Sequence, residues 1–171
     1  MSSFEKTPDF NAMGAQLVND AVRYAGVTGV NFFKDSFTKE GFTDKSFQKW
    51  EGRKGEVDPG RRILTKSDIL ENSVEYEING TKITFFSNEE YADIHNNGGT
   101  IQVRITEKSR KYFWYMYKST KKEMWKWMAL TKKDVMTIKI PARPFIQPSE
   151  TLMANLDEWL LNTILKRFKN P

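Results

Sequence analysis

The 171-residue chain contains no cysteine, one histidine and no long apolar run. Without cysteine it has no disulfide, no thiolate metal ligand and no thiol nucleophile. No segment approaches the roughly 20 apolar residues that a membrane-spanning helix needs. The first residues also lack the basic and apolar stretches of a secretory leader. We therefore expect a protein made in the cytoplasm, with no membrane partner.

What the chain has instead is a large supply of apolar and aromatic side chains. Hydrophobic residues make up 39% of the sequence and aromatic residues 13%, enough to build a core and to disfavour general disorder. The length suits one compact domain. We therefore predict a single domain over residues 1–171.

The positive charge is concentrated in one region. The net charge is +5, but residues 104–139 contain eleven lysines or arginines against three acids, a net of +8, which leaves −3 for the rest. This regional asymmetry is more informative than the overall charge, because it indicates a basic surface confined to one part of the protein.

Apolar residues at helical spacing predict a helix near each end of the chain. The first runs from Asp9, its N-cap, to about Phe37, and we expect it to bend or pause near Gly26 because glycine lowers helix propensity. The second follows Ser149, which suits an N-cap, and has a broad apolar face.

Between these helices, apolar and polar residues alternate as in half-buried strands. Residues 74–78 and 83–85 flank Asn79-Gly80, a pair typical of a two-residue type I′ hairpin turn. Further strands are expected at 101–105 and 136–140. The predicted fold is α+β: an antiparallel sheet with an N-terminal and a C-terminal helix packed on one face.

Residues 39–67 show no sustained period. They mix glycine, proline and charged residues, so we predict a mobile loop, with 52–62 as the part best suited to disorder. Its isolated aromatic residues Phe42, Phe47 and Trp50 can pin parts of the loop to the body.

Residues 104–139 form a basic-aromatic insertion whose section 112–128 fits a hairpin or a short helix equally well. Lysine and arginine interleaved with aromatic rings can neutralise phosphates and stack on bases. The alternative is a sheet extension with packed rings and solvated lysines. The residues expected to contact DNA or a partner are Arg110, Lys111, Lys118, Lys121, Lys122 and Lys126.

Two further segments carry a family resemblance. They are Tyr91-Ala-Asp-Ile-His-Asn-Asn-Gly-Gly99, after the hairpin, and Ile140-Pro-Ala-Arg-Pro-Phe145, before the last helix. In this order they resemble the phage virion morphogenesis family, also called tail completion proteins, which includes protein G of phage Mu. Residues 64–70 resemble a further family segment, except that Asp68 stands where the family usually has glycine.

The resemblance implies a non-enzymatic structural protein of a phage or prophage, acting in virion morphogenesis, tail completion and head-tail joining. Its implied partners are phage tail and head-connector proteins, with genomic DNA as a further contact. It also implies a homo-oligomeric ring in the virion, assembled in the host bacterial cytoplasm. A basic nucleic-acid-binding module using residues 104–139 is the alternative function.

The residues of the structural motif are Tyr91, His95, Gly98, Gly99, Pro141, Arg143, Pro144 and Phe145. We expect no catalytic residue, metal or cofactor among them, because a lone imidazole needs further partners to act as a base or ligand. The nearby acids Glu89, Glu90 and Asp93 fit a solvated turn better than an acid-base pair or a metal site.

Tyr91 and His95 are four residues apart, as on one helical turn, and we expect His95 to hydrogen-bond a backbone carbonyl near Gly98-Gly99. The two prolines of the second motif make a stiff connector that aims Phe145 at the core. Arg143 can clamp a carboxylate or a helix C-terminus within the fold, or reach a neighbouring subunit.

Overall fold

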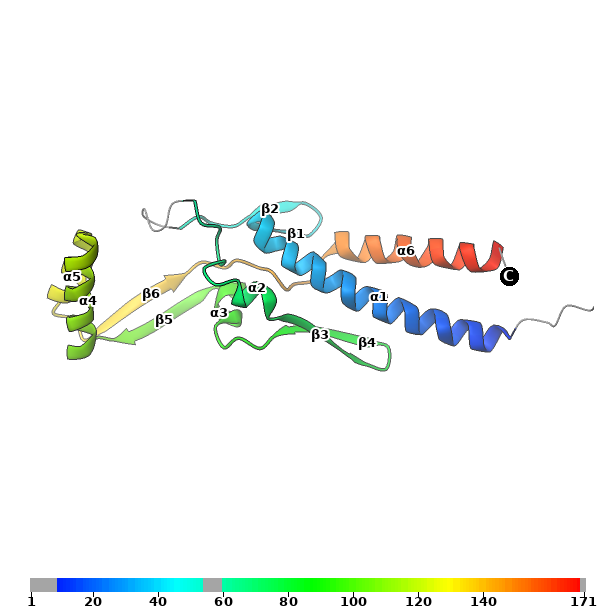
Figure 1. Cartoon of the computed structure of the whole chain (residues 1–171), viewed down its shortest axis with the longest axis horizontal. Coiled ribbons are helices and arrows are strands. Elements are labelled where there is room, and N and C mark those ends of the chain that lie inside the picture. The colour runs from blue at the N-terminus through cyan, green and yellow to red at the C-terminus, as the bar shows by residue number, and fades with distance from the viewer. Residues whose placement is uncertain (1–8, 54–59, 170–171) are drawn as a thin grey trace, which may run out of the picture. The chain divides into compact units, whose positions relative to one another are not determined.

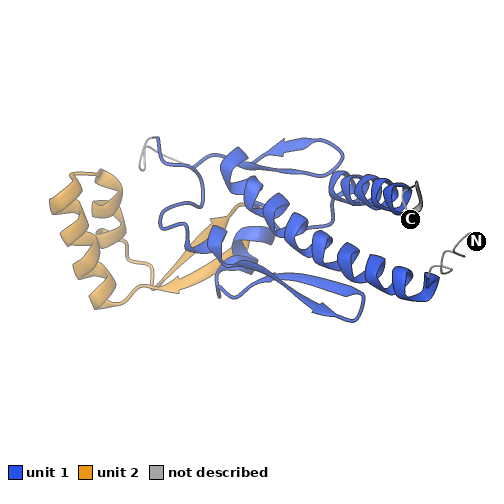
Figure 2. Cartoon of the chain, turned by 45° about the vertical axis from the view of Figure 1, so that its right-hand side comes forward, with its two compact units in different colours: residues 1–97, 142–171 blue, residues 98–141 orange. Residues whose placement is uncertain are grey.

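The computed structural model describes residues 9–53 and 60–169. The chain divides into two compact units, shown in Figure 2. Unit 1 comprises residues 1–97 and 142–171, so it combines both ends of the chain, and unit 2 comprises residues 98–141. The predicted insertion 104–139 falls within unit 2. Across the described residues, no helix is long and apolar enough to cross a membrane.

The predicted α+β class is confirmed. In the described residues the elements follow the order shown in Figure 1: α1 (Phe10–Lys39), β1 (Gly41–Thr43), β2 (Phe47–Lys49), α2 (Ile69–Asn72), β3 (Val74–Asn79), β4 (Lys82–Ser87), α3 (Ala92–Asn97), β5 (Gly99–Arg104), α4 (Glu107–Thr120), α5 (Glu123–Leu130), β6 (Val135–Ile140) and α6 (Glu150–Lys169).

The strands pair antiparallel, as predicted, but as three two-stranded sheets within the described residues: β1–β2, β3–β4 and β5–β6. The expected single sheet is therefore divided. Helix α1 packs on β3 and β4, and α6 packs along α1. The rings of Tyr24 and Trp159 stack at this helix contact, with centroids 4.0 Å apart.

Helix α1 begins at its predicted cap, Asp9, whose side chain accepts two main-chain N–H groups. The predicted bend near Gly26 is wrong, because the helix is continuous. Its glycines allow close packing instead. A Cβ atom at Gly26 would lie 2.3 Å from the Tyr76 ring, and one at Gly29 would lie 2.3 Å from the Phe85 ring. These glycines let the β3–β4 hairpin lie directly against the helix.

The β3–β4 hairpin is confirmed, but its turn differs from the prediction. Asn79 is still in the strand, paired with Lys82, so the two-residue loop is Gly80-Thr81. Gly80 has a φ of +62°, and no positive φ is found at Asn79 or Thr81. A glycine with positive φ at the first loop position is typical of a type II′ turn, so the expected type I′ turn is wrong.

The core of unit 1 fixes much of the segment that was predicted to be a loop. Phe37 is fully buried, and its ring packs on Trp50 and Phe145, with centroids 5.6 and 5.0 Å away. Phe42 and Trp50 are buried and pin this segment as expected, whereas Phe47 is exposed. Residues 39–67 are therefore not one loop. The disorder predicted within 52–62 falls largely on residues 54–59, which lie outside the described residues.

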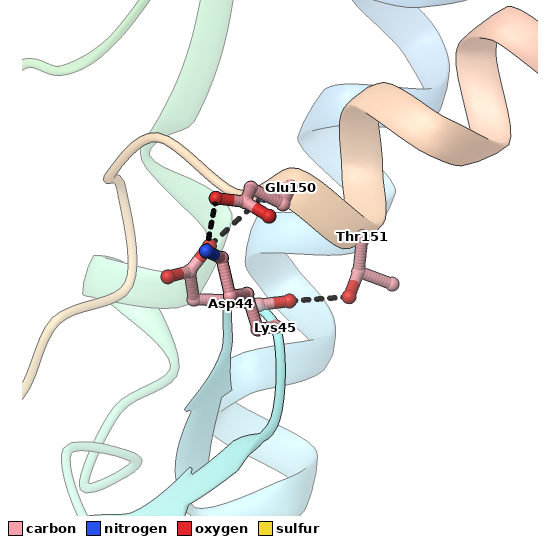
Figure 3. Close-up of polar contacts among 4 residues, drawn as sticks. All are labelled: Asp44, Lys45, Glu150 and Thr151. Atoms are coloured by element: carbon pink, nitrogen blue, oxygen red, sulfur yellow. Dashed lines mark hydrogen bonds and ion pairs between the residues drawn. The ribbon is translucent and has the colours of Figure 1, made fainter.

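The β1–β2 turn is bound to the first turn of α6 (Figure 3). Asp44 accepts the main-chain N–H of Glu150 at 2.9 Å, and Lys45 pairs with the Glu150 carboxylate at 2.9 Å. The Thr151 hydroxyl donates to the Asp44 carbonyl. Ser149 caps α6 as predicted and also donates to a β1 carbonyl. The turn therefore sets where the last helix begins.

In unit 2, β5 pairs with β6, and the residues between them form the helices α4 and α5. This resolves the choice that the sequence left open, in favour of helix. Thr106 and Ser109 form a capping box at the start of α4. A small core of Ile105, Phe113 and Ala129 joins the helices to the strands.

Candidate functional site

The two segments of the family resemblance meet in unit 1. Helix α3 carries His95, and the connector before α6 carries Arg143. The main-chain N–H of Arg143 donates to the carbonyl oxygen of His95 at 2.9 Å. This bond holds the two segments side by side, although they are far apart in the sequence.

Asn96 joins the same two segments through its side chain. Its Oδ1 accepts the main-chain N–H groups of Phe145 and Ile146 at 2.8 and 3.0 Å, and its Nδ2 donates to the carbonyl of Ile146 at 3.1 Å. The sequence alone did not indicate this role for Asn96. The one sequence signal was its position inside the first motif, between His95 and Gly98, where an amide side chain can both donate and accept hydrogen bonds.

Arg143 is inside the fold, with 8% of its surface exposed. Its Nε and Nη2 atoms donate to the carbonyl oxygen of Glu51 at 3.1 and 2.9 Å. The hydrogen-bond partner of Arg143 is thus a main-chain carbonyl, and the Glu51 carboxylate acts on Arg143 through its charge. The indole of Trp50 donates to the Pro144 carbonyl at 2.9 Å, so the chain after β2 is bound twice to the connector.

His95 makes a different contact from the one predicted. Its Nδ1 is buried and has no hydrogen-bond partner among the described residues, and the expected bond to a carbonyl near Gly98-Gly99 is not present. The ring meets Tyr91 edge-on, with centroids 6.0 Å apart. Burial, and then the positive charge of Arg143, lower the pKa of His95. The imidazole is therefore neutral at pH 7.

Tyr91, His95 and Arg143 line one cavity of about 400 Å³. Its other polar walls are Arg53, Arg61, Lys66 and Ser67, and its apolar walls are Ile63, Leu64 and Leu70. Among the described residues, the lining contains four cationic side chains and no carboxylate. Two of these cations are bonded within the fold, because Arg53 donates to the carbonyls of Arg61 and Arg62, and Arg143 donates to that of Glu51.

The remaining motif residues lie apart from this cavity lining. Phe145 is 1% exposed and fills the core, as its place after two prolines predicted. Gly98 follows α3 with a φ of +70°, a conformation that favours glycine. Gly99 pairs with Ile140 across β5 and β6, within unit 2.

The acids near His95 do not gather into a site. Asp93 accepts a hydrogen bond from Asn97 at 2.6 Å. The pKa of Tyr91 is raised, first by burial and then by a hydrogen bond and the negative charge of Glu89. Within the described ranges, no group of three or more histidine or acidic side chains is placed to hold a metal ion.

The basic residues selected in unit 2 differ in their surroundings. Arg110 donates to the carbonyls of Ala129 and Lys133 at 3.1 and 3.4 Å, and so holds the chain that leaves α5. Lys126 pairs with Glu123 at 3.5 Å and lies over the Tyr117 ring. The others are exposed: Lys111, Lys118, Lys121 and Lys122.

The aromatic residues of unit 2 divide in the same way. Phe113 and Trp125 pack against each other with centroids 6.0 Å apart, whereas Tyr115 and Trp127 are 65% and 66% exposed. Trp127 also borders an apolar cavity of about 540 Å³ lined by Met124, Met128, Met136 and their neighbours. Unit 2 therefore presents lysines beside exposed apolar surface.

Comparison with known protein families tests the resemblance carried by the two motifs. A model of the phage virion morphogenesis family matches residues 38–165, which include the hairpin, both motifs and unit 2. The chain belongs to this family. The protein therefore has a role in phage virion morphogenesis and is virion-associated. The likeness to protein G of phage Mu stays a prediction. Searches of curated proteins and of solved structures found no match.

Proposed function

We propose that this member of the phage virion morphogenesis family is a non-enzymatic assembly protein that completes the tail and joins it to the head. The observation that supports the proposal is that residues of the two motifs make contacts that hold the fold together. Arg143 bonds the main chain of a distant segment, and Phe145 fills the core. Residues of the family resemblance thus hold the fold together, which supports a structural role for them.

The surroundings of His95 also favour a non-enzymatic role. A general base is normally oriented by a second group, often a carboxylate. Within the described residues, the His95 ring meets the Tyr91 ring edge-on, and its buried Nδ1 has no hydrogen-bond partner that would orient the imidazole. Replacement of His95 by glutamine is therefore expected to leave assembly intact, and a complete loss of assembly in a folded variant would contradict this.

The proposed partners are tail and head-connector proteins and further copies of the chain arranged as a ring. Helix α6 supports this, because it exposes Met153, Leu161 and Leu165 on one side. Exposed apolar residues gathered on one helix face are typical of interaction surfaces. A rotationally closed set of such contacts gives a ring.

Electron microscopy of lysates tests the proposal. A phage or prophage that lacks this gene should accumulate filled heads and tails that remain unjoined, or tails with aberrant ends. Complementation with Arg143→Ala should restore fewer complete particles than complementation with Lys121→Ala, because only Arg143 is built into the motif. Normal infectious particles in the absence of the gene would refute the assembly role.

A second candidate function is nucleic-acid binding by residues 104–139. Tyr115 and Trp127 are exposed in a unit that also presents Lys118 and Lys121. Contact with genomic DNA through this surface would weaken steeply with salt, because phosphate contacts release counterions. Fluorescence of labelled DNA across a salt series measures this. A Trp127→Ala variant should bind more weakly, since base stacking contributes about 1–3 kcal/mol per ring.

A further inference from the structure

Strands β5 and β6 form a ribbon with one apolar and one polar face. In the antiparallel register Ile101 faces Ile138 and Val103 faces Met136, so these four side chains lie on one side of the ribbon. The other side is mostly polar and carries Thr100, Gln102, Arg104, Thr137 and Lys139. Helices α4 and α5 lie at one end of the ribbon (Figure 1), and Ile101, Val103 and Ile138 remain exposed. A two-stranded ribbon with an apolar face is stable when another element packs on it.

The apolar face of the ribbon continues into the cavity beside α5. Met136 belongs to both, and the cavity of about 540 Å³ is lined further by Met124, Trp127 and Met128. Methionine side chains adapt to an occupant and are common at surfaces that bind amphipathic helices. Trp127 is exposed, and tryptophan is a frequent anchor of protein interfaces. The ribbon face and this cavity together form one surface, the apolar surface of unit 2.

The charge of unit 2 indicates which kind of partner fits this surface. Residues 98–141 contain eleven basic and three acidic residues, a net of +8, whereas the rest of the chain contains sixteen basic and nineteen acidic residues, a net of −3. Lys133 is exposed and lines the cavity. A segment that combines apolar side chains with carboxylates therefore matches the surface in both respects. A nucleic acid would match the charge but would leave the aliphatic side chains of the ribbon uncovered.

Helix α6 of the same chain has this composition on its free side. Met153, Asp157, Leu161 and Leu165 recur at intervals of four, so they follow one side of the helix, and all four are exposed. From Met153 to Leu165 a helix rises about 18 Å, and the six-residue strands β5 and β6 extend about 20 Å. The free side of α6 thus resembles the missing layer in length, hydrophobicity and sign of charge.

We propose that the apolar surface of unit 2 binds the free side of α6 from a second copy of this chain. The contact joins two different surfaces, so it can repeat from one copy to the next and close into a ring. The proposal rests on the assembly role proposed above and deepens it, because it names the two surfaces that meet between neighbouring copies. Self-association is measured in solution without a virion, whereas the lysate experiment tests head-tail joining. The two can therefore fail separately.

Sedimentation velocity of the full-length chain, over a range of protein and salt concentrations, provides the test. Leu161→Asp changes the middle of the free side of α6, and Trp127→Asp places a carboxylate in the apolar surface of unit 2. Both positions are exposed, and circular dichroism checks the fold of each variant. The matched controls are Val18→Asp in unit 1 and Tyr115→Asp in unit 2, which introduce aspartate at exposed apolar positions outside the two surfaces.

The wild-type chain should form dimers and larger species as its concentration rises, and salt should weaken them by screening the opposite charges. Leu161→Asp and Trp127→Asp should each weaken association by about tenfold or more, whereas the controls should behave as the wild type does. A mixture of Leu161→Asp and Trp127→Asp should give dimers and no larger species, because it offers one intact α6 to one intact surface of unit 2.

The mixture distinguishes this contact from a general loss of solubility or fold. The proposal is overturned if the mixture associates no better than the separate variants, or if the controls weaken association equally. It is also overturned if the wild-type chain stays monomeric, whether or not a short DNA duplex then binds through Trp127.

Discussion

The Oδ1 atom of Asn96 accepts the main-chain N–H of Phe145 at 2.8 Å, across 49 residues of sequence. One amide side chain thereby satisfies main-chain groups of the connector that precedes α6. Buried main-chain donors are costly when they lack a partner, so this amide matters more than a surface asparagine would. Asn96 is consequently a strong determinant of how the two motifs fit together.

Asn96→Ala should lower the free energy of unfolding by about 2–4 kcal/mol, because three hydrogen bonds are lost and main-chain groups remain unpaired. Asn162→Ala is the control, because Asn162 is exposed on α6 and has no side-chain hydrogen bond among the described residues. Its replacement should not lower stability. Urea unfolding followed by tryptophan fluorescence measures both. Equal effects of the two substitutions would show that the Asn96 bridge contributes little.

Arg143→Ala should lower the free energy of unfolding by about 2–3 kcal/mol, since the Glu51 carbonyl loses two charge-assisted hydrogen bonds. Arg143→Lys should recover little of this loss. Both bonds come from one planar guanidinium, and an ammonium group cannot reproduce that geometry. Comparison of the two variants by urea unfolding is decisive: full recovery by lysine would indicate that only the charge matters.

Gly29→Ala should destabilise the protein by about 1–3 kcal/mol through overpacking, because the new Cβ would lie 2.3 Å from the Phe85 ring. Gly14→Ala in the same helix should have the opposite effect. No atom lies within 4 Å of a Cβ there, so the gain in helix propensity should raise stability by about 0.5–1 kcal/mol. Thermal unfolding of the two variants should therefore shift Tm in opposite directions.

Asp68 occupies the position where the family resemblance expects glycine, and it has a φ of +53°. Asp68→Gly should raise the free energy of unfolding by up to about 1 kcal/mol, since glycine adopts a left-handed conformation without a Cβ penalty. The Asp68 side chain makes no capping hydrogen bond to α2, so little is lost with the carboxylate. A clear loss of stability in urea unfolding would mean that the carboxylate has a favourable contact after all.

Local signals made part of the fold predictable. The β3–β4 hairpin followed from strict alternation, and the caps Asp9 and Ser149 followed from residue types that satisfy helix N–H groups. Strands β1 and β2 were not predicted, because three residues are too few to show an alternation of apolar and polar side chains. Helices α4 and α5 stayed ambiguous for a related reason, since their aromatic residues suit strands as well.

Long-range partners were beyond sequence reasoning. The carbonyl that binds Arg143 belongs to Glu51, 92 residues earlier, and no spacing rule links two such positions. Gly26 looked like a helix breaker because its packing partner, Tyr76, is on another element. The cavity could not be predicted for the same reason, because its lining combines residues from 53–70 with Tyr91, His95 and Arg143. Motif recognition located His95 and Arg143 but did not show that they share one cavity.

The lowered pKa of His95 makes the stability of the protein depend on pH. In the folded protein the pKa of His95 is lower than its ordinary value of about 6.5. As the pH falls below that value, the unfolded chain therefore binds a proton at this histidine more readily than the folded chain does. The free energy of unfolding should therefore decrease as the pH falls from about 7 to 5, and His95→Gln should remove this contribution.

Carboxylates titrate in both proteins, so the difference between their stability curves isolates the histidine. Urea unfolding across this pH range should give a smaller slope for the variant than for the wild-type chain. A larger slope in the variant would mean that His95 is stabilised in its charged form, and that Arg143 and burial do not control it.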